Sequence, residues 1–93
     1  MPTFAALFPL AKLFITPGAR DVSIRLALSP LEMSVRHATG DWSEMGAMDQ
    51  ASNKDAIQDG SRVLSVYQVS DERFFAITEA DRGSTTVLLA REY

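Results

Sequence analysis

His37 is the only histidine of this 93-residue chain, which contains no cysteine. Asp41 follows it by four residues, and a histidine near a carboxylate can act as a general acid or base. The same histidine falls in the last turn of a predicted helix, where its imidazole can stabilise the helix end while Trp42 packs over the core. The sequence is compatible with both interpretations.

A second group of polar residues lies in the C-terminal part of the chain. Thr78 and Thr85 belong to neighbouring segments with strand periodicity, and Arg62 and Arg82 flank them. Hydroxyl and guanidinium groups together can hold a phosphate, although threonine is also a good strand former. If the protein is a metal-independent ribonuclease, the predicted catalytic residues are His37, Arg62, Thr78, Arg82 and Thr85.

Charge is spread unevenly along the chain. Residues 1–40 carry four basic and two acidic side chains (+2), and residues 41–93 carry five basic and ten acidic ones (−5). The segment 41–59 suits a basic partner surface, although it can equally be a solvated helix face. Aromatic and methionine side chains are common interface anchors. The predicted binding residues are Asp41, Trp42, Glu44, Met45, Met48, Asp49, Asp55 and Asp59.

The composition also argues against several functions. A net charge of −3 does not favour nonspecific binding of duplex DNA, which requires neutralisation of phosphates. One histidine without cysteine and without a metal-ligand spacing gives no metal site, and no phosphate-binding or dinucleotide-binding glycine motif predicts a cofactor. The sequence therefore predicts neither a metal nor a cofactor.

The first 15 residues are apolar, but Pro9 and Lys12 interrupt them. They lack the basic start of a signal peptide, and they are shorter than the roughly 20 residues that cross a bilayer. We therefore expect a soluble, cytoplasmic protein without a membrane partner.

The N-terminal half predicts a strand followed by helices. Residues 10–16 favour a strand, and Thr16-Pro17 could start a helix. Residues 22–28 are ambiguous, because apolar residues alternate there as in a strand but also fit a helical stripe, and the spacing alone slightly favours a strand. Residues 29–40 have a capping box that begins at Ser29 and a terminal Gly40. The apolar face predicted for this helix consists of Leu31, Val35 and Ala38.

The C-terminal half predicts a weakly amphipathic helix over 47–58 and then three strands. The strand segments are 62–69, 73–79 and 84–90, and the short turns between them imply antiparallel neighbours. The predicted fold is α+β, with an N-terminal strand and two to three short helices packed on a C-terminal three-stranded antiparallel meander. We expect residues 1–93 to form a single domain, with 1–9 as a flexible or packed extension.

Three stretches of the chain form a recognisable pattern: His37–Trp42 (HATGDW), Asp59–Tyr67 (DGSRVLSVY) and Ile77–Leu89 (ITEADRGSTTVLL), followed by Glu92-Tyr93. Together they resemble a family of short, largely uncharacterised proteins from bacterial plasmids and other mobile elements. The resemblance begins at about Leu10 and implies a helix over 19–27. The chain departs from the family at Ser43, where glycine is usual, and at Phe74-Phe75, where tryptophan is frequent.

The resemblance implies an accessory protein of a mobile element. Small acidic α+β proteins of this origin are similar in character to inhibitors of host defence systems, including anti-CRISPR proteins, so the expected partner is a host protein with a basic surface. One alternative is a ribonuclease of barnase, colicin or RelE-like architecture, a likeness of architecture alone. The other is a structural or regulatory homodimer with an exposed strand edge.

Overall fold

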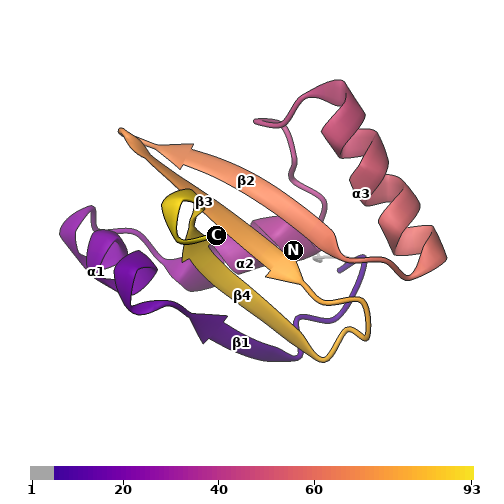
Figure 1. Cartoon of the computed structure of the whole chain (residues 1–93), viewed down its shortest axis with the longest axis horizontal. Helices are drawn as coiled ribbons and strands as arrows, with labels where there is room; N and C mark the ends of the chain where they lie inside the picture. The colour runs from indigo at the N-terminus through magenta and orange to yellow at the C-terminus, as the bar shows by residue number, and fades with distance from the viewer. Residues whose placement is uncertain (1–5) are drawn as a thin grey trace, which may run out of the picture.

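The computed structural model describes residues 6–93, which fold into one four-stranded sheet with three α-helices and a short 3-10 turn (Figure 1). The sheet has the strand order β1-β4-β3-β2. The strands are β1 (Lys12–Ile15), β2 (Val63–Val69), β3 (Glu72–Thr78) and β4 (Ser84–Leu89). The helices are α1 (Pro17–Arg25), α2 (Pro30–Ala38) and α3 (Ala47–Asp59), and the turn is η1 (Ala90–Glu92). The predicted α+β fold is confirmed.

The C-terminal meander forms as predicted. β2 pairs antiparallel with β3, and β3 pairs antiparallel with β4. The two tight turns each contain a left-handed residue that is not glycine: Ser70 has φ 56° and Arg82 has φ 58°. L-residues rarely adopt this conformation, and the Arg82 side chain is held by hydrogen bonds to the Ser61 and Ala56 carbonyls.

The N-terminal strand completes the sheet in a way that the sequence did not predict. β1 runs parallel to β4, with Lys12 opposite Ser84 and Ile15 opposite Val87. Parallel neighbours need a long crossover connection, and here the three helices and two strands between β1 and β4 supply it. In Figure 1, α2 crosses behind the sheet, α1 lies beside the end of β1, and α3 lies beside β2.

Residues 17–25 form a helix despite their alternating apolar pattern. The hydroxyl of Thr16 accepts a hydrogen bond from the Ala19 backbone N–H (3.2 Å), as an N-cap does. Val22 is buried, but Ile24 points into solvent, so the alternation does not mark a buried face. The strand that the spacing slightly favoured is wrong, and the helix implied by the resemblance is confirmed.

Helix α2 begins and ends where the capping signals predicted. The Ser29 hydroxyl accepts from the Glu32 backbone N–H (3.2 Å), and Gly40 follows the helix with φ 79°. The predicted apolar face is wrong at Leu31, which is exposed, whereas Val35 is half-buried and Ala38 is buried as predicted. The other residues that α2 buries are Met33, Ser34 and His37.

Two apolar clusters form the core on the helical side of the sheet. In the larger one, Val22 of α1 and Met33 of α2 pack on Phe74 and Val87. The members of the smaller one are Phe8, Ala38, Trp42, Ala56 and Val63. Of the predicted extension over 1–9, residues 1–5 lie outside the described residues, whereas Phe8 is a buried member of this second cluster.

Candidate functional site

A chain of buried polar side chains connects α2 to the sheet. His37 Nδ1 lies 2.5 Å from the Ser65 hydroxyl, and His37 Nε2 lies 2.8 Å from the Thr78 hydroxyl. The Thr78 and Thr85 hydroxyls are 2.7 Å apart, and Thr85 donates to the Leu10 carbonyl (3.0 Å). The sequence predicted His37, Thr78 and Thr85 as site residues, and the fold brings these three together.

The hydrogen-bond chain has a defined direction because a carbonyl can only accept. The proton of Thr85 goes to Leu10, so Thr78 must donate to Thr85. His37 Nε2 must then donate to Thr78, which leaves Nδ1 to accept from Ser65. With a neutral imidazole that carries its proton on Nε2, each hydrogen bond of this chain joins one donor to one acceptor.

The electrostatics of the site agree with this neutral form. Burial, with a smaller contribution from the positive charge of Arg82, lowers the pKa of His37 from 6.5 to about 4. The side chain is 0% exposed, and both ring nitrogens are occupied. A general base must reach a proton of its substrate, so in this structure the imidazole holds α2 on the sheet. Asp41, the predicted carboxylate neighbour, forms its ion pair with Arg36 instead.

The segment before β1 closes the histidine site. Phe8 is buried, and its ring packs edge-on against His37, with the ring centroids 5.0 Å apart. The Leu7 backbone N–H donates to the Ala38 carbonyl (2.8 Å) at the end of α2. The segment thereby separates the imidazole from solvent.

The two arginines of the predicted ribonuclease site are used elsewhere. Arg82 donates to the carbonyls of Ser61 (2.6 Å) and Ala56 (2.9 Å), and so holds the C-terminal end of α3. Arg62 is two residues before Leu64 on β2, on the sheet face that points away from His37. The predicted combination of a histidine base with two free arginines is therefore not present in this conformation.

Two of the predicted acidic contact residues are tied down within the molecule. Arg36 forms ion pairs with Asp41 (2.7 Å) and Glu44 (3.1 Å), and its guanidinium lies 4.4 Å from the centroid of the Tyr67 ring. The hydrogen bond from Arg36 keeps the pKa of Asp41 below its ordinary value. Burial raises the pKa of Tyr67 to about 12, and its hydroxyl donates to the Asp41 carbonyl (3.0 Å). These contacts fix the loop between α2 and α3.

The predicted apolar anchors divide into buried and exposed ones. Trp42 is 4% exposed and belongs to the second core cluster, so its ring is not available to a partner. Within residues 6–93, its indole Nε1 is a buried donor without a hydrogen-bond partner. Met45 is half-buried and packs against the same cluster. Met48 on α3 is 86% exposed and keeps the character predicted for an anchor.

Helix α3 is the most exposed element of the predicted binding segment. Of its 13 residues, Asn53 and Ala56 are buried. Met48, Asp55 and Asp59 follow each other at spacings of seven and four residues, which places them on one helix face. Asp49 is exposed one residue after Met48. Among residues 6–93, the ion pairs use other carboxylates and leave these three aspartates without one.

Asn53 anchors α3 to the sheet, a role that the sequence did not predict. Its side-chain oxygen accepts from the Leu64 backbone N–H (3.2 Å), and its nitrogen donates to the Leu64 carbonyl (2.7 Å). Glu44 accepts from the Gln68 backbone N–H (2.9 Å) further along β2. Side chains therefore occupy part of this sheet edge, which makes it less open to a strand of a second copy. One signal was present, since Asn53 shares a helix face with Ala56.

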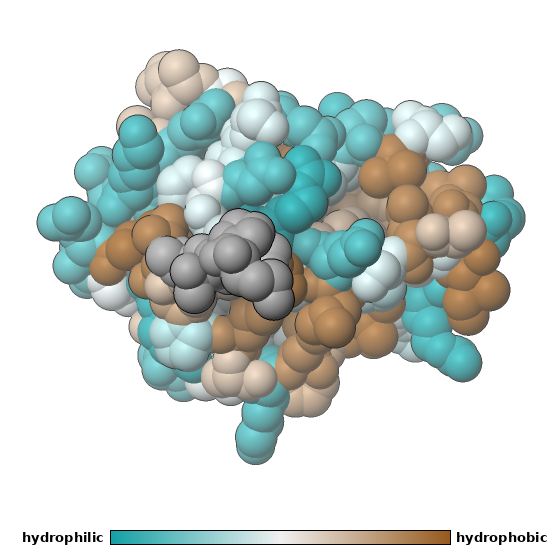
Figure 2. Space-filling view, turned by 180° about the vertical axis from the view of Figure 1, so that it is seen from behind, coloured by the Kyte–Doolittle hydropathy of each residue, from teal (hydrophilic) through white to brown (hydrophobic). Residues whose placement is uncertain are grey.

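The back of the molecule carries some apolar surface as well. Two hollows share Val35: one is lined by Leu31 and the aliphatic part of α2, and the other by Pro9 and Leu10. Figure 2 shows brown apolar patches gathered near the middle and one side of this face, with polar surface between them.

Neither a metal cluster nor a membrane helix is found in the part of the chain that the structure describes. Over residues 6–93, His, Asp and Glu side chains do not gather into a group of three that could hold a metal ion. In the same range, each helix is too short or too polar to cross a bilayer.

Comparison of the chain with family models, with curated proteins and with solved structures gave no match.

Proposed function

We propose that this protein acts by binding another protein, with the outer face of α3 as its contact surface. The expected target is a host protein with a basic surface, such as a nucleic-acid-binding defence complex that a mobile element would inhibit. The resemblance in the sequence supports the mobile-element origin, and the charge of the 41–59 segment supports the basic partner.

One observation carries the proposal: α3 presents an exposed methionine among carboxylates that no intramolecular ion pair uses within residues 6–93. Met48 is exposed at the start of the helix, and Asp49, Asp55 and Asp59 are exposed around and beyond it. A flexible apolar side chain with surrounding charges matches the usual anatomy of an interface, in which a few anchors are surrounded by a polar rim. Asp41, Trp42 and Glu44 are occupied inside the molecule and are not part of the proposed contact.

The helix is also held in a way that leaves this face free. Asn53 and Ala56 attach it to the rest of the molecule, and Arg82 donates to the Ala56 carbonyl, so these anchoring contacts lie on the inner side. A rigidly held helix loses little conformational freedom when it binds, which favours affinity.

The test compares two variants of equal charge. The first reverses the α3 aspartates (Asp49→Lys, Asp55→Lys, Asp59→Lys), and the second reverses three exposed carboxylates elsewhere (Asp21→Lys, Glu32→Lys, Asp71→Lys). Partners of the wild-type protein are captured from nuclease-treated host lysate, identified, purified and titrated with both variants by calorimetry. We expect the first variant to bind at least about tenfold more weakly and the second to bind like wild type.

Equal binding by both variants would contradict the α3 surface. Binding that does not weaken as salt is raised would contradict the charge complementarity, because exposed ionic contacts are screened. If neither the wild type nor the variants retain a protein after nuclease treatment, the protein-binding function itself is wrong.

A further inference from the structure

The sheet has a second face that α2 does not cover. Side chains alternate along a strand, so the residues next to the core-facing ones point to the opposite side. Phe74 belongs to the larger core cluster, whereas its neighbour Phe75 belongs to neither cluster. The register places Phe75 beside Val66 and Leu88, and Phe14 beside Thr86. We call the side of the sheet defined by these residues the open face.

Aromatic rings are displayed on the open face. Phe14 on the edge strand β1 is 52% exposed. Tyr93, which follows η1, is 68% exposed, and its ring packs edge-on against Phe75 with the centroids 5.6 Å apart. In Figure 1, η1 is the element in front of the sheet, so the tail of the described chain lies over this face. Arg62 donates to the Tyr93 hydroxyl (2.6 Å) and thereby fixes the ring.

The charged residues of the open face are mostly basic. By the same alternation, Lys12, Arg62 and Arg73 project on this side, against two carboxylates: Glu79, and Asp81, which lines the hollow beside Lys12 and Phe14. That is +1 (three cations minus two anions) in a chain whose net charge is −3. The open face is therefore less acidic than the molecule as a whole.

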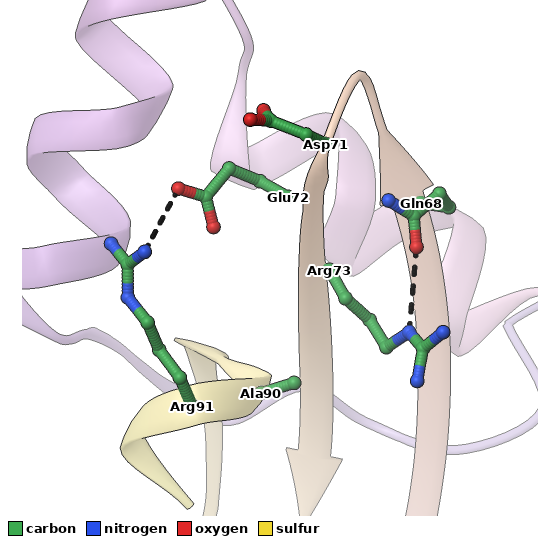
Figure 3. A pocket seen from close by; sticks show the side chains of 6 residues that line it. All are labelled: Gln68, Asp71, Glu72, Arg73, Ala90 and Arg91. Atoms are coloured by element: carbon green, nitrogen blue, oxygen red, sulfur yellow. Dashed lines mark hydrogen bonds and ion pairs between the residues drawn. The ribbon is translucent and has the colours of Figure 1, made fainter.

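Arg73 is available to a ligand. Its Nε forms one long hydrogen bond to the Gln68 side chain (3.4 Å), and the guanidinium stands beside β2 in Figure 3. Arg91 in the same hollow is committed to Glu72 (3.1 Å). Of the two arginines that line this hollow, Arg73 therefore has no ion pair within residues 6–93 and can contact a phosphate.

We propose that the open face binds single-stranded nucleic acid. Exposed rings on an open sheet stack unpaired bases, and flanking cations contact the phosphates. Phe14 and Phe75 are two strands apart and two residues apart along the strands, which is roughly 12 Å, a distance that an unstacked strand of nucleic acid can span. Asp71 and Asp81 lie in the turns at the two ends of β3 and repel phosphates there, so the strand of nucleic acid crosses the sheet from β1 towards β2.

The experiment is fluorescence anisotropy with the full chain and labelled oligonucleotides of about 12 nucleotides, a length that covers a site of this size. The probes are oligouridine, oligothymidine and a duplex of equal length, at about 50 mM salt. We expect both single strands to bind more tightly than the duplex, and the two probes distinguish RNA from DNA as the source of the ligand. Phe14→Ala and Tyr93→Ala should each weaken binding by about tenfold.

Two further variants test the details. Arg73→Ala should reduce the dependence of affinity on salt, because one phosphate contact is lost. Ile24→Ala is the matched control, since Ile24 is 67% exposed on α1, away from the open face, and its removal should leave affinity unchanged. Circular dichroism spectra and thermal unfolding confirm that each variant is folded.

Three results would overturn the proposal. The first is the absence of saturable binding of either single strand by wild type in the high micromolar range. The second is equal binding by Phe14→Ala, Tyr93→Ala and Ile24→Ala. The third is a dimer in analytical ultracentrifugation that Phe14→Ala converts to a monomer, because a second copy would then occupy the face. The α3 charge-reversal variant should lose no oligonucleotide affinity, because it removes only carboxylates that lie outside the open face. Failure of this proposal can therefore be distinguished from failure of the proposed protein-binding function.

Discussion

Helices α2 and α3 follow each other in the chain but are attached to the sheet in opposite ways. α2 buries four of its nine residues, including the polar Ser34 and His37. α3 buries two of its thirteen, Asn53 and Ala56. Each helix therefore buries a polar side chain that reaches β2, but α2 lies over the core whereas α3 lies along the sheet edge.

The difference shows how a small protein can separate stability from recognition. His37 binds side chains of two strands, so changes at α2 reach the centre of the sheet. Asn53 binds the backbone of a single edge residue, Leu64, so the exposed residues of α3 can vary without disturbing the core. A binding surface tolerates change best on an element of the second kind, which supports the assignment of α3 as the contact helix.

The largest expected effect is that of removing the imidazole from α2. His37→Ala leaves the Ser65 donor and the Thr78 hydroxyl without their partner and creates a cavity at a fully buried site. We expect the free energy of unfolding, measured by urea denaturation, to fall by about 3–5 kcal/mol. Met48→Ala on α3 is the control and should change it by less than about 0.5 kcal/mol. If both variants lose a similar amount of unfolding free energy, α2 and α3 do not differ in their contribution to stability.

A pH titration sharpens the comparison further. The pKa of His37 is lowered in the folded protein from 6.5 to about 4, so the unfolded chain takes up a proton first as the pH falls. The stability contributed by the neutral imidazole is complete above pH 6.5 and is lost between pH 6.5 and about 4, by up to about 3 kcal/mol. Asp41, whose pKa is lowered from 3.8, loses its contribution only below this window.

The measurement is the free energy of unfolding at several pH values across that window. His37→Gln removes the titrating imidazole, so its profile should be flat from neutral pH down to about pH 5, below which carboxylates such as Glu92, whose pKa is lowered from 4.5, begin to contribute. A wild-type profile that is equally flat would show that His37 does not change its pKa on folding.

The smallest of the three effects is expected at the α3 anchor. Asn53→Ala removes both hydrogen bonds to Leu64, and we expect a loss of about 1–2 kcal/mol in the free energy of unfolding. Hydrogen exchange should accelerate in α3 while β3 stays protected, since opening of the helix is local. Ser52→Ala, at the exposed neighbouring position, should leave exchange unchanged. Uniform acceleration across the whole chain would mean that α3 does not open separately.

Local signals predicted most of the elements correctly. The capping residues Ser29 and Gly40 placed α2, and the short turns predicted the meander. The pairing of β1 with β4 was not predictable, because nothing local records contacts between residues so far apart. The alternation near Val22 favoured a strand where the structure has a helix. Both periodicities fit so short a segment, and only the tertiary environment distinguishes them.

The site was less predictable than the fold. His37, Thr78 and Thr85 were candidates from their residue types, but spacing left open whether they lie together. Their burial was not predicted, because it depends on Phe8 covering the imidazole. Spacing assigned Leu31 to the buried face of α2. In the structure Leu31 is exposed, and the polar residues Ser34 and His37 are buried on that face. Polar residues can replace apolar ones there because the fold supplies a hydrogen-bond partner for each, which helical periodicity alone does not reveal.

The parallel pairing of β1 with β4 has a consequence for the order in which the molecule is made. Thr85 donates to the Leu10 carbonyl across 75 residues of sequence. During synthesis on the ribosome, the first strand therefore has no partner until β4 has been translated, while the helices and the β2–β3 hairpin can already assemble. The histidine chain ends on that late contact, so the nascent protein gains its sealed centre only after nearly the whole described chain has been made.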